Sequence, residues 1–252
     1  MTMNNANRIS GTFEQSWYQA FSVTHNWPQK RSRRLLNYYL QYVSNFRLEN
    51  STVLDIGGGS GLLSFICAEL GSKVTCIDPL SDGSNSNMLK LRQIILQGCR
   101  HKQIEFLPSS FQDFAESNKF DVIFMHNSVN HLDEYACLNL NESDMARLKY
   151  ITIFQKISRI SKNNGLLIVS DCSNRNLFGD LGFVNLFAPT INWQLHQDPE
   201  TWIKIIKNCN LEFIEVLWSS PQIFGSFGKK FLRNKHFAYL TTSHFTIVFR
   251  SK

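Results

Sequence analysis

The chain has 252 residues, of which 43% are hydrophobic and 18% are charged. This length allows one large α/β domain with a substantial core and is short for two domains. The sequence has no run of about eighteen apolar residues, and its first part lacks the apolar run of a signal peptide. We therefore expect no membrane span and a cytoplasmic protein.

The six cysteines are scattered singly, without a C-x-x-C pair or a His/Cys cluster at zinc spacing. They predict buried, reduced thiols and no metal site.

The net charge of +6 is spread unevenly along the chain. Residues 1–50 hold six basic and two acidic residues, whereas residues 221–252 hold six basic residues and no acidic one. Basic ends of this kind fit an ordinary solvated surface, and they also fit an anionic partner such as nucleic acid.

The stretch Val53 to Gly61 reads as an apolar strand, a glycine turn and the start of an apolar helix over 62–70. Two ligands suit such a turn, a dinucleotide or S-adenosylmethionine. The dinucleotide pattern G-x-G-x-x-G requires glycine or alanine at position 62, where this chain has Leu62. Asp55 beside the turn would repel a pyrophosphate but attract an ammonium or sulfonium group. The spacing and the charge favour S-adenosylmethionine.

A second acidic residue follows the next predicted strand, residues 73–77. Asp78 stands about twenty residues after the glycines, where α/β folds place the carboxylate that binds a ribose diol.

With these residues, and with Phe120–Leu132 as a fourth strand and its loop, the chain resembles the class I (Rossmann-like) S-adenosylmethionine-dependent methyltransferases. The resemblance covers roughly residues 35–220. It implies an α/β fold with a seven-stranded, mostly parallel Rossmann-like sheet, an antiparallel final strand and helices on both faces. It also implies an N-terminal helical lid over 1–50 and a methyltransferase domain over 51–252, with inserted loops at 171–198 and 221–242.

The apolar pattern predicts further elements along the chain. A helix over 145–160 has Leu148 in its apolar stripe and is expected to end at Asn164-Gly165. Other helices are expected over 31–46, 88–97 and 198–207. The remaining strands are expected over 104–107, 166–170, 211–218 and 244–249.

The resemblance also assigns cofactor contacts, with S-adenosyl-L-methionine as cofactor and S-adenosyl-L-homocysteine as product. Ser110 and Phe111 are expected at the adenine, although Asp113 is an alternative. The complete set is Asp55, Gly57, Gly58, Gly59, Gly61, Asp78, Pro79, Ser110, Phe111 and His126.

The acceptor side is less defined, because an in-line displacement from sulfur needs a base only when the acceptor must lose a proton. His131 is the predicted base, and its alternative role is to hydrogen-bond its own loop. The aromatic segment 13–27 either shapes the acceptor pocket or packs the first helix. The predicted acceptor contacts are Tyr18, Asp171, Arg175, Trp193 and His196.

These features predict N- or O-methylation of a small molecule, for example a natural-product tailoring step. One alternative is a nucleic-acid methyltransferase with phosphate contacts from Lys229, Lys230, Arg233 and Lys235, although the Asn/Asp-Pro-Pro-Tyr motif of base methylation is absent after the fourth strand. Another alternative is a non-catalytic module that binds S-adenosylmethionine.

Overall fold

The computed structural model describes residues 9–79, 86–115, 117, 119–220 and 232–252. By its internal contacts the chain divides into two compact units, Met1–Phe114 and Ala115–Lys252.

Three short strands of the first unit run parallel to one another: β1 (Thr52–Ile56), β2 (Lys73–Ile77) and β3 (Ile104–Leu107). All but the first residue of β1 are buried, as expected for a parallel strand that is covered on both sides. Ile56 lies opposite Ile77, so β1 and β2 end at the same edge. The glycine turn and Asp78 therefore follow neighbouring strand ends.

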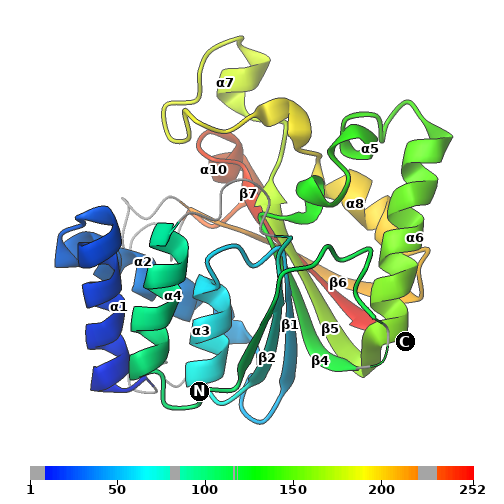
Figure 1. Cartoon of the computed structure of the whole chain (residues 1–252). Coiled ribbons are helices and arrows are strands. Elements are labelled where there is room, and N and C mark those ends of the chain that lie inside the picture. Colours follow the sequence, from blue (N-terminus) through cyan, green and yellow to red (C-terminus); the bar gives the residue numbers. More distant parts are fainter. Residues whose placement is uncertain (1–8, 80–85, 116, 118, 221–231) are drawn as a thin grey trace. The chain divides into compact units, whose positions relative to one another are not determined.

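The described residues of the first unit also form the helices α1 (Gly11–His25), α2 (Gln29–Tyr42), α3 (Leu62–Glu69) and α4 (Ser86–Gly98). A short 3₁₀ turn, η2 (Val43–Asn45), follows α2. Helix α1 packs along α4, as the blue and green helices show (Figure 1). Phe13, Trp17 and Phe21 are buried on α1, and the Trp17 indole donates a hydrogen bond to the Ser32 carbonyl at 3.0 Å. These three buried aromatic side chains therefore form the packed face of α1.

The second unit contains β4 (Phe120–His126), β5 (Ser161–Cys172), β6 (Leu211–Trp218) and β7 (His244–Ser251). Strand β5 runs parallel to β4, and β7 runs antiparallel to both β5 and β6. The predicted antiparallel final strand is confirmed.

The helices of the second unit lie in its connections. Helix α6 packs against α5 and α8 (Figure 1). The described elements are η3 (Val129–Leu132), α5 (Glu134–Leu138), α6 (Asp144–Ile160), α7 (Leu177–Asp180), η4 (Trp193–Leu195), α8 (Pro199–Ile206) and α10 (Lys235–Tyr239).

The strand order is β3-β2-β1-β4-β5-β7-β6 in one seven-stranded sheet. The predicted fold class, a mostly parallel Rossmann-like sheet with helices packed against it, is confirmed.

Two details of α6 differ from the sequence prediction. The helix does end at Ile160, as the predicted range 145–160 has it, but the residue that follows, Ser161, is extended and pairs with Phe120 of β4, so the Asn164-Gly165 pair does not end the helix. Asn164, expected to end the helix, instead has a φ of +62° where the pairing of β4 with β5 is irregular. Leu148, expected in the buried stripe, is exposed.

The first predicted loop, residues 171–198, begins within β5, and the connection that follows the strand, residues 173–198, is held by one buried amide. Asn185 donates hydrogen bonds to the Thr241 carbonyl at 2.7 Å and to the Asn176 side chain at 3.3 Å. Its own side-chain oxygen accepts from the Phe187 backbone N–H at 2.9 Å. Around this buried residue the apolar side chains point outward, with Leu186 78% exposed.

All six cysteines are buried and free, as predicted. Among the described helices, none combines the length and the apolarity that crossing a membrane requires. Of the second predicted loop, residues 221–231 lie outside the described residues, and so do Lys229 and Lys230.

Candidate functional site

The turn between β1 and α3 depends on glycine for its backbone shape. Gly57, Gly59 and Gly61 have φ values of +68°, +53° and +78°, a region that side chains disfavour. A Cβ on Gly58 would lie 2.4 Å from the Cys76 sulfur, and a Cβ on Gly61 would lie 2.6 Å from the Phe106 ring. A Cβ on Gly59 would meet nothing within 4 Å. The turn is therefore closely packed at two glycines and open at Gly59.

Asp55 is buried beneath this turn. The Ser64 hydroxyl donates a hydrogen bond to its carboxyl at 2.6 Å. Burial is the main cause that raises the pKa of Asp55 to about 6; the Ser64 hydrogen bonds and Arg92 oppose the shift, and the nearby negative charge of Asp78 adds to it. The site therefore holds a carboxyl group whose ionised form would gain from a nearby cation.

Asp78 is tied directly to the glycine turn. Its Oδ2 accepts a hydrogen bond from the Gly59 N–H at 2.9 Å. Both predicted acidic residues of the first unit thus lie at the turn, as the sequence predicted from two separate strand ends.

Arg92 is a residue of this site that the sequence analysis missed. From α4 its guanidinium donates to the Gly59 carbonyl and, at 3.4 Å, to the Ser60 carbonyl, and it lies 4.3 Å from the centre of the Phe106 ring. A lone arginine beside buried Leu91 on an amphipathic helix was the available signal. This side chain holds the open part of the turn in place.

The expected adenine residues sit in the turn after β3. The Ser110 hydroxyl donates to the Asp113 carboxyl at 2.6 Å, so these two alternatives are bonded to each other. Phe111 is buried, and Pro79, after β2, is exposed.

Tyr18 lies on α1 within a local polar network. Its hydroxyl bonds to Glu14 and accepts from Arg33 at 3.1 Å. Burial, and then the hydrogen bond to Glu14, raise the pKa of Tyr18.

In the second unit, two predicted acceptor residues from distant positions meet. His196 Nδ1 lies 2.9 Å from Asp171 Oδ1, which also accepts from the Cys172 N–H at 2.8 Å. Asp171 Oδ2 is buried and has no hydrogen-bond partner in the part of the chain that the structure describes. The His196 side chain is 13% exposed, and its ring centre lies 6.1 Å from that of Trp193. This is an oriented imidazole with its Nε2 left for a ligand.

Two more histidines lie at the ends of β4 and β7, the two strands that flank β5. The His126 ring, at the end of β4, lies 6.1 Å from the His244 ring at the start of β7. Burial, with a smaller contribution from His244, lowers the pKa of His126 to about 3. Burial also lowers the pKa of His244 to about 4, although Asp171 opposes this shift. Both rings are neutral near pH 7.

His131, the predicted base, lies in η3 on the surface. Its side chain is 53% exposed and its Nδ1 lies 2.7 Å from the Glu134 carboxyl. The preceding residue, Asn130, is buried, and neither polar atom of its side chain has a partner among the described residues. Because buried polar atoms are almost always paired, Asn130 is a polar group left available to a ligand or water.

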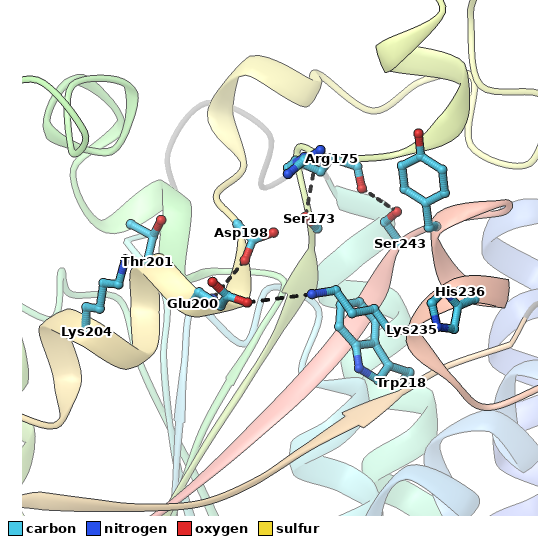
Figure 2. Close-up of a pocket in the computed structure, with 11 residues that line it drawn as sticks. Ser173, Arg175, Asp198, Glu200, Thr201, Lys204, Trp218, Lys235, His236 and Ser243 are labelled. Atoms are coloured by element: carbon cyan, nitrogen blue, oxygen red, sulfur yellow. Dashed lines mark hydrogen bonds and ion pairs between the residues drawn. The ribbon is translucent and has the colours of Figure 1, made fainter.

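A cavity of about 380 Å³ opens at the carboxyl ends of β5 and β6 (Figure 2). Ser173 follows β5, Trp218 ends β6 and Ser243 precedes β7. Arg175, a predicted acceptor residue, is 70% exposed at this cavity. Asp198 and Glu200 line it from the start of α8.

The described residues contain no group of three or more His, Cys, Asp or Glu side chains placed to hold a metal ion.

Comparison with known proteins identifies the family. The profile described as "Methyltransferase domain" matches residues 48–210, more than half of the chain. The chain belongs to the class I S-adenosylmethionine-dependent methyltransferases.

The sequence of this methyltransferase aligns with only part of a curated relative. It is 31% identical over 141 residues to the ubiquinone biosynthesis O-methyltransferase of Xanthomonas oryzae pv. oryzae, an alignment that covers 52% of this chain and 56% of the relative. The chain thus spans about half the length of the curated relatives that it matches.

Solved structures share the fold at low identity. Magnesium protoporphyrin IX methyltransferase (ChlM) from Synechocystis PCC 6803 with bound S-adenosylmethionine has a TM-score of 0.54 at 12% identity, covering 99% of this chain and 98% of that one. The [4+2]-cyclase SpnF has a TM-score of 0.52 at 13% identity, covering 88% and 82%.

The cofactor that this membership implies is S-adenosylmethionine, and the turn fits it. Its ammonium and sulfonium charges would meet the buried Asp55 carboxyl, whose raised pKa reflects burial without a sufficient cation. Gly59 leaves open space at the turn.

Proposed function

We propose that this methyltransferase transfers a methyl group to a small molecule. The observation that carries the proposal is the cavity of about 380 Å³ at the carboxyl ends of β5 and β6. Small-molecule sites usually have volumes of about 300–1,000 Å³, and open α/β sheets bind ligands at this edge. The named activities of the ubiquinone and protoporphyrin enzymes, both on small molecules, agree with it.

S-adenosylmethionine, when bound, supplies a methyl group activated by its sulfonium. We assign the ribose hydroxyls to Asp78 and the ammonium to Asp55. Arg92 positions the turn through the Gly59 carbonyl.

Two histidines are candidates to take a proton from the acceptor. His131 remains the predicted base, with its Nδ1 on Glu134. His196 has a comparable carboxylate partner in Asp171, and its imidazole is far less exposed. A buried and oriented imidazole favours His196 for an acceptor hydroxyl or ammonium group.

Substitution of each histidine tests which of the two takes the proton from the acceptor. His196→Gln should lower kcat about a hundredfold while leaving S-adenosylhomocysteine affinity unchanged, because the imidazole acts on the acceptor. His131→Gln is the matched test of the other histidine. A large loss of kcat with His131→Gln alone would place the base there.

The alternative functions would give different results in a labelling experiment. A nucleic-acid methyltransferase would use the basic residues after position 220, and the SpnF fold shows that a relative of this architecture is named for a cyclisation. A non-catalytic module would bind S-adenosylhomocysteine and transfer no label.

The test uses methyl-labelled S-adenosylmethionine with the protein and a cell extract, followed by separation into small-molecule, nucleic-acid and protein fractions. We expect label in the small-molecule fraction, and none with Asp78→Ala. Label that nuclease releases from the large fraction would refute the small-molecule proposal.

A further inference from the structure

The cavity of the second unit combines positive charge with aromatic surface (Figure 2). Arg175, Lys204 and Lys235 contribute the positive charges, and Trp218 and Tyr239 contribute the rings. A planar ligand with a negative charge would be complementary to such walls.

The two acidic residues of the cavity, Asp198 and Glu200, already contact groups of the protein. Asp198 accepts a hydrogen bond from the Glu200 N–H at 2.9 Å and so caps α8. The Glu200 carboxylate lies 3.6 Å from the Lys235 ammonium, which joins α8 to α10. Their charges are thus partly satisfied within the walls.

Two of the cations, Lys204 and Arg175, are not held in a close ion pair by the carboxylates of the cavity. Lys204 has no ion-pair partner in the part of the chain that the structure describes. Arg175 lies 4.0 Å from Asp180, a carboxylate that already accepts a hydrogen bond from the Tyr239 hydroxyl at 2.9 Å. A guanidinium at that distance retains most of its capacity to bind an oxyanion in a bidentate manner.

Three wall residues of the cavity lie close in the chain to the polar cluster of Asp171, His196 and His244. Each of three wall residues stands one or two positions from one member of this cluster. The pairs are Ser173 with Asp171, Asp198 with His196, and Ser243 with His244. His196 does not itself line the cavity, but the wall residue Asp198 follows it by two positions in the chain.

We propose that this cavity binds the methyl acceptor and that the acceptor is an aromatic molecule bearing an oxyanion, either a carboxylate or a phosphate. Arg175 and Lys204 bind the oxyanion, and Trp218 contacts the ring. The inference rests on the proposed function, because it names the acceptor class of the same site.

The test is calorimetric titration of the full chain at low ionic strength with benzoate, phenyl phosphate and neutral benzamide. We expect the preferred anion to bind with a Kd on the order of 1 mM and benzamide to bind at least about tenfold more weakly. The tighter of the two anions identifies the oxyanion. Equal binding of benzamide and both anions would overturn the proposal, as would no binding of either anion.

Substitutions locate the binding. Arg175→Gln and Lys204→Gln should each weaken anion binding about fivefold, and Arg175→Lys should weaken it less. Lys207→Gln, at the end of the same helix but outside the cavity, is the matched control and should change the Kd by less than about twofold. An equal loss with Lys207→Gln would mean unspecific attraction and would overturn the site.

A parallel titration with S-adenosylhomocysteine separates the two proposals. Tight S-adenosylhomocysteine binding without anion binding would refute the acceptor class alone. Anion binding without S-adenosylhomocysteine binding would refute the methyltransferase proposal.

Discussion

At the residue scale, Asp55 links cofactor binding to stability. Because burial raises its pKa to about 6, the folded protein keeps a proton on this carboxyl at pH values where the unfolded chain has lost it. The folded state therefore binds more protons than the unfolded state between about pH 4 and pH 6. The contribution of Asp55 to the free energy of unfolding falls as the pH rises through this window.

Asp55→Asn removes this dependence. The variant should be more stable than the natural protein at about pH 7, by on the order of 1–3 kcal/mol, and the difference should shrink toward about pH 4. Urea unfolding at the two pH values measures it. The same variant should bind S-adenosylhomocysteine more weakly at pH 7, because the ammonium loses its carboxylate. A stability difference that does not change with pH would contradict the account.

Gly59 and Gly61 should respond differently to alanine. Gly61→Ala should mainly lower stability, by about 1–3 kcal/mol, because a left-handed φ is combined with a Cβ 2.6 Å from the Phe106 ring. Gly59→Ala has the same type of φ but open space around its Cβ, so it should lose proportionally more S-adenosylhomocysteine affinity than stability. Thermal unfolding and calorimetry of both variants give the comparison, and identical profiles would argue against a ligand at Gly59.

Sequence predicted these residues because strand ends, glycines and carboxylates have local signatures. It did not predict Arg92 on the turn or the pairing of Asp171 with His196. Both contacts join residues 25 or more positions apart, and side-chain geometry across such a distance depends on the folded backbone.

At the element scale, the connection over residues 173–198 depends on Asn185. Its three hydrogen bonds hold this segment in place. The apolar side chains of the segment are largely exposed, so burial of apolar surface stabilises it little. Local opening of such a segment is controlled by few contacts.

Asn185→Ala should loosen this connection with little change in global unfolding. Losing the buried hydrogen bonds costs about 1–3 kcal/mol locally, so limited proteolysis within residues 177–192 should accelerate at least about tenfold. Asn192→Ala is the control, because that side chain makes a single exposed hydrogen bond at 3.4 Å. Equal acceleration in both variants would show that Asn185 does not anchor the segment.

At the boundaries of α6, strand pairing and helix packing override the signals of the local sequence. The Asn164-Gly165 pair predicted a helix end, but pairing of Ser161 with Phe120 ended α6 four residues earlier than Asn164. The apolar pattern predicted the existence of α6 correctly and placed Leu148 on the wrong face. The packing of α6 against α5 and α8 decides which residues are buried, and these partners were not visible in its own sequence.

At the scale of the whole molecule, each of the two units carries one of the two proposed binding sites. The first unit carries the glycine turn with Asp55 and Asp78, and the second carries the cavity and the Asp171–His196 pair. The family and the mostly parallel sheet with its antiparallel final strand were predictable, because their signals are strands and strand ends spaced along the chain. The acceptor class that we propose was not predictable, because it rests on charges gathered from the connection after β5, from α8 and from α10.

The most direct measurement is calorimetric titration of the chain with S-adenosylhomocysteine, with Asp78→Ala and Glu105→Gln as a matched pair. Glu105 is an exposed carboxylate on the neighbouring strand β3 and controls for the loss of one negative charge. We predict one binding site, a Kd about a hundredfold weaker in Asp78→Ala, and no change in Glu105→Gln. An absence of binding by the natural chain, or unchanged affinity in Asp78→Ala, would contradict the account of the glycine turn as the cofactor site.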